Sequence, residues 1–428
     1  RRAPYLMCEY LHAMGTGPGN AAGYAAQMSH RRHAGGFVWE WRDHALWRTL
    51  PDGRRALSYG GDFGEEVHDG SFVCDGLVDA LSRPYAGTWA WVSAMAPDAP
   101  ALADAINESR SGSQEQEAHL RALLDAAVTP VSSPKDADGA FRLAEDGRLS
   151  RVGDMPVSMS LSVFRAPTDN DRGRGPVDYW GIDTDDMGSL GVGRGEAGTS
   201  HAMRWERERL HLLRRRLVSI EEEGIIRRVV ERWSPPAAQF GATLVWEYSP
   251  VRLGQDMGRG LRVSLRIAPY GRWPERVPRL GVRVDMPGAR WEASWLGETL
   301  IGYPDMAVPG ARGCGHGEAS DLWDVGVRPQ EGGHRRDVEA LSLRGQTGEL
   351  VILPASPLGW SVSPWSEREL AQASHWEELP ASDRLFLWLD VFQDGIGTRS
   401  CGPDSRPEFA GRMRDCEVTF VIAQVGGD

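Results

Sequence analysis

The chain begins with two short apolar runs that flank a segment of helical composition. The run PYLMCEY occupies residues 4–10, and the run GGFVWEW occupies residues 35–41. A glycine-rich turn follows the first run, and residues 20–32 are compatible with a helix. Strand, helix and strand in this order predict a parallel βαβ unit.

Residues 136–428 show a different pattern, in which apolar and polar residues alternate over short runs separated by Gly, Pro and Asp. A period of two is typical of strands with one buried face. The number and spacing of the runs predict a large antiparallel β-sandwich. The runs are RRLVSIEEE, IIRRVVERW, ATLVWEY, LRVSLRIA, LGVRVDM, RLFLWLDVF and EVTFVIAQV.

The segment between these two regions lacks strand alternation and is rich in Ala, Asp, Glu, Ser and Gln. Residues 119–128 predict a helix, and residues 107–117 are polar and predict a loop. We interpret residues 81–135 as a linker or a reduced β-sandwich domain. The chain then divides into residues 1–80, 81–135 and 136–428, and a length of 428 residues allows such a division.

The composition narrows the class of protein. Hydrophobic residues make up 41% and charged residues 25%, which is typical of a folded globular protein. No apolar run is long enough for a membrane span, and a net charge of −12 disfavours binding to nucleic acid. Five cysteines without a C-x-x-C pair indicate a reducing compartment, and we expect a cytoplasmic protein.

Glu9 is the first candidate for chemistry. It lies near the end of the first predicted strand, and Trp39 lies near the end of the second. In α/β barrels the chemistry takes place at the C-terminal ends of the strands, where both residues would lie. The alternative is that Glu9 is an exposed carboxylate without a function. The motif C-E-Y-x-H-A-M-G-x-G-x-G around Glu9 is long and favours a functional site.

Several segments resemble family 2 glycoside hydrolases, in particular the large β-galactosidases. RRAPYLMCEYLHAMGTGPGN and GGFVWEWRDHAL resemble consecutive barrel strands, and YGGDFGEEVHDGSFVCDGLV resembles the end of the barrel domain. FRAPTDNDRG, SVSPWSERELAQASHWEELP and LDVFQDGIGTRSCGP resemble parts of the C-terminal domain. The resemblance implies a multidomain α/β plus all-β chain. It would hold the last two strands of a TIM (β/α)8 barrel, followed by a β-sandwich similar to galactose mutarotase.

The resemblance also implies an activity and a site. The activity is β-galactosidase, the retaining hydrolysis of terminal β-D-galactose from β-galactosides such as lactose, with Glu9 as the nucleophile. His12 would bind a galactosyl hydroxyl, and Trp39 would form the apolar wall of the sugar pocket. Gly173 and the residues after it would form a mobile loop near the active site.

The family also implies metal ions. Phe72, through its backbone carbonyl, and Asp75, through its side chain, would hold Na⁺ beside the galactosyl unit. Asp75 stands where a family member has Asn, and a carboxylate still binds a hard cation. The Mg²⁺ ligands of the family lie upstream of the nucleophile, so we expect them in a missing N-terminal half or a partner chain.

The general acid is also expected outside this chain. A retaining glycosidase needs a second carboxylic acid about 5–5.5 Å from the nucleophile, and no carboxylate precedes Glu9 here. Glu40 and Asp43 are alternatives, but Glu40 alternates with Trp39 along a strand and should face away from the pocket. Two strands cannot close a barrel, so we expect this chain alone to be inactive. The family further implies a homo-oligomer.

A second hypothesis from the sequence is a non-catalytic carbohydrate-binding or assembly fragment built on the C-terminal sandwich. Two other clusters have metal-binding alternatives. The run HWEE over residues 375–378 could suggest a metal site, and the run DND over residues 169–171 could suggest Ca²⁺. Their spacing does not match a known metal loop, and we expect structural or helix-capping roles for both.

Overall fold

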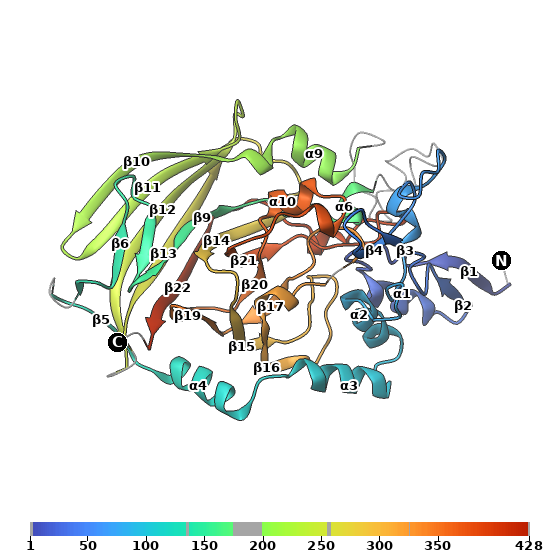
Figure 1. Ribbon diagram of the computed structural model, residues 1–428, viewed down its shortest axis with the longest axis horizontal. Coiled ribbons are helices and arrows are strands. Elements are labelled where there is room, and N and C mark those ends of the chain that lie inside the picture. The colour runs from blue at the N-terminus through green and yellow to red at the C-terminus, as the bar shows by residue number, and fades with distance from the viewer. Residues whose placement is uncertain (1–2, 134–136, 174–198, 255–257, 325, 427–428) are drawn as a thin grey trace.

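The computed structural model describes residues 3–133, 137–173, 199–254, 258–324 and 326–426. It is mostly a β-sandwich with few helices (Figure 1). The larger sheet has ten strands, and all its pairs are antiparallel. Its strands are β5 (Val128–Pro130), β10 (Arg214–Glu223), β11 (Ile226–Ser234), β12 (Gly241–Leu253), β13 (Arg259–Tyr270), β15 (Glu292–Glu298), β16 (Arg312–Glu318), β18 (Ala340–Gly345), β19 (Gly348–Pro354) and β22 (Cys416–Val425).

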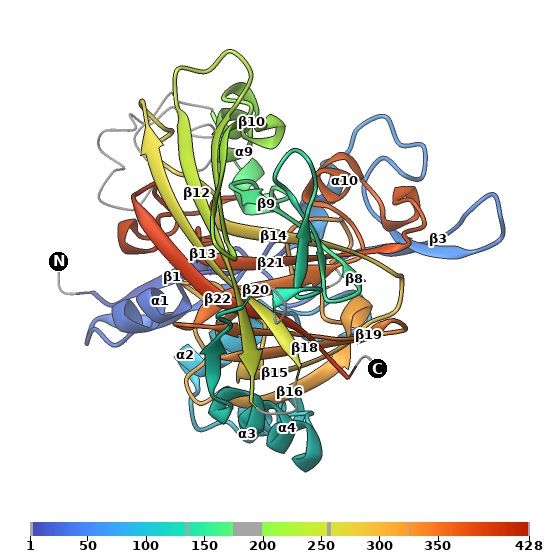
Figure 2. The same ribbon diagram turned by 90° about the vertical axis from the view of Figure 1, so that its left-hand side faces the viewer.

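A second antiparallel sheet packs against the first, and Figure 2 shows the two together. Its strands are β9 (Ser158–Ser162), β14 (Arg279–Pro287), β17 (Arg335–Val338), β20 (Leu358–Ser363) and β21 (Arg384–Gln393). The main core lies between the two sheets and contains the fully buried rings of Trp246, Trp295 and Trp360. A small sheet of β6 (Phe141–Leu143), β7 (Leu149–Val152) and β8 (Met155–Pro156) adjoins this core.

The seven predicted runs all form strands, because their alternate residues face the core between the sheets. The antiparallel sandwich is therefore confirmed. The sequence did not identify the strands from β15 to β20. One of them, β16, has the sequence RGCGHGE, in which glycine replaces the apolar residues of an ordinary strand.

The segment between residues 1–80 and the sandwich contains three helices, α2 (Ala86–Met95), α3 (Pro100–Ser109) and α4 (Gln114–Asp125). The loop predicted over residues 107–117 is wrong, since only residues 110–113 separate α3 from α4. The Ser113 hydroxyl caps α4 in a capping box with Gln116, which starts this helix. Leu120 and Leu123 of α4 pack on the outer face of the larger sheet. The segment therefore covers part of the sandwich as well as connecting the two regions.

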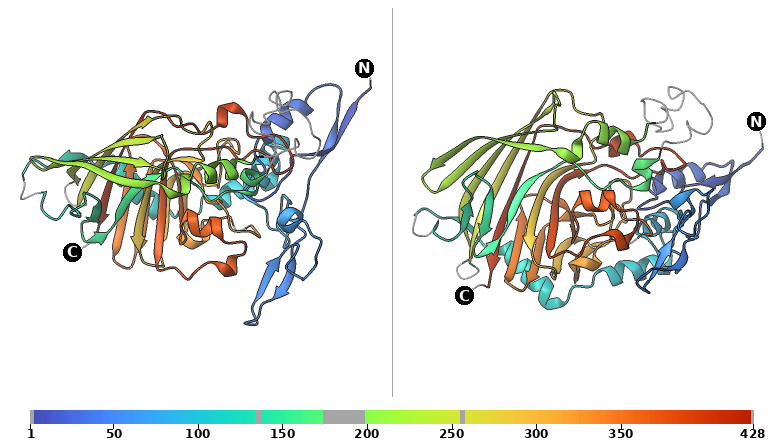
Figure 3. Two further views of the ribbon diagram at one scale, coloured as in Figure 1. Left: turned by 90° about the horizontal axis from the view of Figure 1, so that it is seen from above. Right: turned by 45° about the horizontal axis from the view of Figure 1, so that its top comes forward.

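The N-terminal segment forms the predicted βαβ unit. Strand β1 (Tyr5–Tyr10) pairs in parallel with β2 (His33–Val38), and α1 (Ala21–Met28) connects them. Within the described residues this sheet has two strands. The unit lies at one end of the molecule, away from the main body of the sandwich (Figures 1 and 3). A hairpin of β3 (Leu46–Thr49) and β4 (Arg55–Ser58) also extends away from the sandwich (Figure 3).

Shorter elements complete the part of the chain that the structure describes. They are α6 (Asp169–Arg172), α9 (His201–Arg207), α10 (Glu367–Gln372), η1 (Gly70–Val73), η3 (Leu210–Leu212), η4 (Ala319–Asp321), η5 (Trp376–Glu378) and η6 (Pro407–Phe409). No helix in the described ranges is long and apolar enough to cross a membrane.

The loop after β1 fastens the βαβ unit to the sandwich. The Gly19 amide donates to the Gly397 carbonyl at 2.9 Å, and the Asn20 amide donates to the Asp305 carbonyl at 3.0 Å. The Asn20 side chain also donates to the Asp404 carbonyl at 3.0 Å. All these acceptors belong to the sandwich domain, so residues 11–20 have a fixed position on it.

Asp404 is the centre of a buried ionic network at this junction. Its Oδ2 lies 2.7 Å from His201 Nε2, 2.7 Å from Arg276 Nη1 and 3.3 Å from Arg399 Nη1. Burial alone would raise the pKa of Asp404, but His201, Arg276 and Arg399 hold this pKa far below its usual value. The carboxylate therefore stays ionised at the junction and orders the loop that carries it.

We expect Asp404→Asn to lower the free energy of unfolding by about 3–5 kcal/mol at pH 7, because it leaves buried cations without their anion. Since the folded pKa is depressed, the contribution of Asp404 is fully present above the unfolded pKa of about 3.9 and is lost as pH falls below it. Urea unfolding followed by circular dichroism from pH 7 to pH 3 measures both effects.

The matched control is Asp154→Asn, which removes a solvent-exposed ion pair with Arg151 and should change stability little. The difference between the wild type and Asp404→Asn should shrink below about pH 4. A difference that stays constant down to pH 3 would contradict the assigned role of the carboxylate.

Candidate active site

Glu9 lies at the C-terminal end of β1, next to the end of β2. Tyr10 is the register partner of Val38, so Glu9 and Trp39 lie at the same edge of the parallel pair. Glu9 is exposed, and its carboxylate makes no hydrogen bond or ion pair with another residue that the structure describes. The carboxylate is therefore open to a ligand approaching the strand ends.

His12 is buried and connects the N-terminal segment to the sandwich. Its Nδ1 lies 2.9 Å from the Ser400 hydroxyl, and its Nε2 lies 3.1 Å from Asp75 Oδ2. The Phe72 ring packs against the imidazole with 5.1 Å between ring centroids. Two segments far apart in the sequence, residues 72–75 and the loop at residue 400, thus fix one imidazole three residues after Glu9.

Asp75 is the second buried polar residue of this cluster. The Trp39 indole donates to Asp75 Oδ2 at 3.2 Å, while the indole ring itself is 41% exposed. Burial would raise the pKa of Asp75, but the neighbouring His12, Glu40 and Trp39 side chains hold it below its usual value. Trp39 is therefore oriented by Asp75 and still presents an apolar surface to solvent.

The donor set around Asp75 is compatible with a hard cation. Asp75 Oδ1 is buried and has no hydrogen-bond partner among the described residues, and a metal ion would satisfy it. Phe72, in the short helix η1, lies beside the same cluster, where its carbonyl could serve as an oxygen ligand. In the described part of the chain, no three His, Cys, Asp or Glu side chains gather into a metal site. Further ligands for Na⁺, and all those for Mg²⁺, would therefore have to come from other groups.

Glu40 departs from the sequence expectation. Strand β2 ends at Val38, so strand alternation does not extend to residues 39 and 40. Glu40 and Trp39 both interact with Asp75, and the prediction that Glu40 faces away is wrong. Burial raises the pKa of Glu40 to about 7, and the Asp75 carboxylate adds to the rise.

Asp43 is not accessible to a substrate. Its carboxylate is buried and accepts hydrogen bonds from the Tyr85 hydroxyl at 2.6 Å and the Gly76 amide at 2.8 Å. Burial is the main reason why its pKa rises to about 7. Through these contacts Asp43 joins its own segment to residues 76 and 85, which is a structural role.

Gly173 lies close to the site but does not reach Glu9 through any contact in the described structure. It follows α6, and its carbonyl accepts from Arg399 Nε at 3.1 Å, one residue before Ser400. A Cβ at this position would meet the Arg399 carbonyl oxygen at 2.4 Å, so the backbones are in close contact. The predicted loop after Gly173 lies in residues 174–198, which are outside the described residues.

Sequence analysis missed Ser400, and it named Asn170 only as part of the DND run, without placing it in this site. The Ser400 hydroxyl contacts His12, and the Asn170 side chain accepts from the Ser400 amide at 3.2 Å and donates to the Met14 carbonyl at 3.4 Å. Ser400 belongs to the run TRSC, and Asn170 belongs to the acidic turn at the start of α6. Neither has a local signal, because their partners lie 156 or more residues away.

The two clusters with metal-binding alternatives have structural roles. His375 contacts Asp62 at 2.9 Å and Glu378 at 3.1 Å, and these contacts tie residue 62 to the sandwich. Thr168 and Asp171 form a capping box at α6, and Asp171 also pairs with the buried Arg165 at 2.7 Å. The predicted capping role is confirmed.

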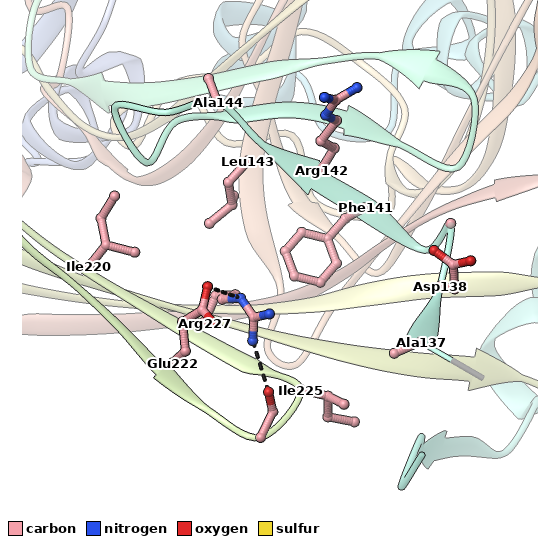
Figure 4. A pocket seen from close by; sticks show the side chains of 12 residues that line it. Ala137, Asp138, Phe141, Arg142, Leu143, Ala144, Ile220, Glu222, Ile225 and Arg227 are labelled. Atoms are coloured by element: carbon pink, nitrogen blue, oxygen red, sulfur yellow. Dashed lines mark hydrogen bonds and ion pairs between the residues drawn. The ribbon is translucent and has the colours of Figure 1, made fainter. Parts of the chain in front are cut away.

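A cavity of about 470 Å³ lies between β6 and the β10–β11 hairpin (Figure 4). Phe141 and Ile220 give it an apolar lining, and Glu222 and Arg227 form an ion pair beside it. This hairpin is at the opposite end of the molecule from β1 (Figure 1). The cavity is therefore separate from the Glu9 cluster.

Two family models match the chain. The model for the TIM barrel domain of family 2 glycosyl hydrolases matches residues 1–91. The model for the β-galactosidase small chain matches residues 142–422. The boundary between the two matches falls in the helical segment that contains α2, α3 and α4.

Individual relatives agree with the family models. A β-galactosidase from Arthrobacter sp. (strain B7) is 29% identical over 96% of this chain, which covers 49% of that protein. One from Staphylococcus xylosus is 21% identical over 97% of this chain and 49% of its own length. β-Galactosidase BgaC of Bifidobacterium adolescentis is 43% identical over 19% of this chain and 8% of its own. The chain thus spans about half the length of the curated relatives that it matches along its whole length.

Among solved structures, a putative aldose 1-epimerase from Escherichia coli K12 aligns with 71% of this chain and 100% of its own. The identity is 14% and the TM-score is 0.31, a value that carries no argument about fold or function. The similarity to galactose mutarotase therefore stays a prediction. The small-chain model matches more than half of the chain, so the chain belongs to the β-galactosidase small-chain family, and its residues 1–91 are similar to the TIM barrel domain of family 2 glycosyl hydrolases.

Proposed function

We propose that this chain supplies the nucleophile and part of the sugar pocket of a retaining β-galactosidase. The observation that carries the proposal is the cluster at the ends of β1 and β2. Glu9 is open to solvent there, and beside it His12 and Trp39 are held by Asp75. An accessible carboxylate beside an oriented aromatic wall suits a pyranose, whose C–H face packs on an indole.

The proposed reaction has two steps. In the first, the Glu9 carboxylate attacks the anomeric carbon, the glycosidic C–O bond breaks, and the leaving oxygen takes a proton from a carboxylic acid. In the second, the same acid residue, now a carboxylate, takes a proton from a water molecule whose oxygen attacks the anomeric carbon. The ester bond to Glu9 breaks, galactose leaves and the Glu9 carboxylate is regenerated. His12 would contact a galactosyl hydroxyl in place of its contact with Ser400 or Asp75, and Na⁺ at Asp75 and the Phe72 carbonyl would lie beside the sugar. Cytoplasmic location and a homo-oligomeric state are further parts of this proposal.

The exposed apolar surface of the N-terminal segment supports an acid supplied by another segment. Most of the exposed large apolar side chains among the described residues lie in this segment. They are Tyr5, Leu6, Phe37, Trp39, Trp41, Leu46, Trp47, Phe63, Val67 and Leu81. A concentration of exposed apolar side chains in one segment indicates an interaction surface. We propose that the remaining barrel strands cover it and bring the general acid and the Mg²⁺ ligands.

The first test compares the 428-residue chain alone with the chain joined to a segment that supplies the remaining barrel strands. With a nitrophenyl β-galactoside and Mg²⁺, we expect turnover only from the joined form, because the chain alone lacks the acid. Glu9→Gln in the joined form should lower kcat by a factor of about 10³ or more, since the amide cannot act as the nucleophile.

Other outcomes discriminate between the hypotheses. Turnover by the joined form that persists in Glu9→Gln would exclude Glu9 as the nucleophile. Binding of galactose without hydrolysis by the joined form would favour a carbohydrate-binding fragment. Glu9-dependent turnover by the chain alone would mean that the acid lies among these 428 residues.

The second test concerns Glu40, the alternative acid inside this chain. Its interaction with Asp75 indicates a positioning role, so we expect Glu40→Gln in the joined form to change kcat for lactose less than about tenfold. Loss of a general acid would cost about 10²–10⁴. This loss would appear with lactose but far less with a nitrophenyl galactoside, whose leaving group needs little protonation. A large loss restricted to lactose would identify Glu40 as the acid.

A further inference from the structure

Strand β10 forms a free edge of the larger sheet. It is at one end of the strand order and pairs with β11 alone, as Figures 1 and 2 show. Among the residues that the structure describes, no backbone hydrogen bond reaches β10 from its other side. A row of unpaired N–H and C=O groups is a template for another strand.

The sequence of β10 separates its charges by sign. It reads RRRLVSIEEE, with three arginines at one end, three glutamates at the other and an apolar centre. In that centre Val218 is 55% exposed and Ile220 is 39% exposed. Edge strands that resist pairing carry charged side chains that would repel those of an added strand or would be buried without a partner. Here an antiparallel copy of the same strand would place each arginine end against a glutamate end.

A β-bulge decides which side chains share a face. The pairing of β10 with β11 shifts between Leu217 and Ser219, so Val218 is the extra residue. Before the bulge, Leu217 packs against the core. After it, Ile220 lies opposite the buried Val229 and points toward the cavity of Figure 4. The alternation of inner and outer faces therefore shifts by one residue across Val218.

This shift makes one self-pairing register consistent. Residues directly opposite in an antiparallel pair point to the same face. With a twofold axis between positions 218 and 219, Arg214 of one copy lies opposite Glu223 of the other, and Arg216 lies opposite Glu221. All four side chains are on the outer face. Without the bulge, these pairs would fall on opposite faces of the sheet.

The inner-face charges of β10 are already neutralised within the chain. Arg215 contacts Glu231 at 2.6 Å, and Glu222 contacts Arg227 at 3.0 Å, an ion pair drawn in Figure 4. They would lie opposite each other across the same axis and would need no rearrangement.

Most of the outer-face charges have no such partners. Arg214, Arg216 and Glu223 form no ion pair with any residue in the described part of the chain. Glu221 makes two exposed contacts, with Arg228 at 3.2 Å and with the Ser219 hydroxyl at 3.1 Å. Arg216 lies directly opposite Arg232, a like-charge pair that destabilises the sheet edge. A glutamate from a second copy would relieve this repulsion.

We propose that β10 is a self-complementary dimerisation edge, on which a second copy of this chain adds its own β10 antiparallel to the first. The two larger sheets become one continuous sheet along a contact about 33 Å long. The contact is narrow and its outer rim is ionic, so association is reversible and weakens with salt. This surface is independent of the candidate active site and of the proposed hydrolase function.

Charge-swap variants test the register. R214E/R216E and E221R/E223R each place like charges opposite each other in a homodimer, and each should raise the dimer Kd at least about tenfold. Mixed together, the two variants restore all four outer-face pairs and should form a 1:1 dimer with a Kd close to that of the wild type. Sedimentation velocity at low and high salt measures all species.

The matched control is R262E, a charge reversal on the interior strand β13, which should leave the Kd unchanged. Restored pairing in the mixture also shows that both variants are folded. A wild-type chain that stays monomeric at about 100 μM, variants that dimerise as the wild type does, or a mixture that remains monomeric would each overturn the proposal.

A cross-linking measurement separates this contact from association through the apolar N-terminal segment. V218C places the two new thiols beside the proposed axis, and mild oxidation should give a covalent dimer. R262C should give none above the level of the unmodified chain, which already has exposed thiols at Cys8 and Cys401. Equal cross-linking of V218C and R262C would contradict the register.

Discussion

The candidate site depends on a buried carboxylate that belongs neither to the nucleophile strand nor to the sugar pocket. Asp404 accepts from His201, Arg276 and Arg399, and its backbone carbonyl accepts from Asn20. The loop that contains it also contains Ser400, which contacts His12. Without this ionic network, a loop of polar residues would have to be ordered against its conformational entropy by hydrogen bonds alone. The network thus lets a β-sandwich determine the position of side chains that belong to a barrel.

The two halves of the site have unequal support. His12 and Asp75 are buried and held by several segments, whereas Glu9 lies on a two-stranded sheet that is exposed along much of its length. One face of this sheet packs against α1 and α2 through Met7, Tyr10 and Val38, but a two-stranded sheet by itself is marginal in water. Catalysis by a carboxylate requires a position fixed to a fraction of an ångström by rigid neighbours. The sandwich therefore fixes the positions of His12 and Asp75, whereas the Glu9 carboxylate is held by no contact within the described residues.

Sequence patterns predicted the parts of the fold in which side-chain periodicity is strong. Apolar runs and alternation predicted the βαβ unit and seven sandwich strands. They could not predict β16, because its alternate positions are glycine. The start of helix α4 was predictable from Ser113 and Gln116, which have the spacing of a capping box. The polar composition of residues 107–117 favoured a loop instead. In the candidate site, family motifs predicted Glu9, His12 and Asp75. Ser400 was not predicted, because its partner His12 lies 388 residues away.

The exposed state of Glu9 has a consequence for how activity divides between segments. A solvated carboxylate is well stabilised by water, which weakens its interactions with any ligand in proportion to the local dielectric constant. Covering the apolar faces beside β1 and β2 would exclude water from the strand ends and strengthen every electrostatic contact there. The segment that covers Phe37 and Trp41 would then do more than contribute an acid. It would also lower the local dielectric constant around the Glu9 carboxylate. Under the proposed function, the reactivity of Glu9 would then depend on that segment as well as on the position that this chain gives it.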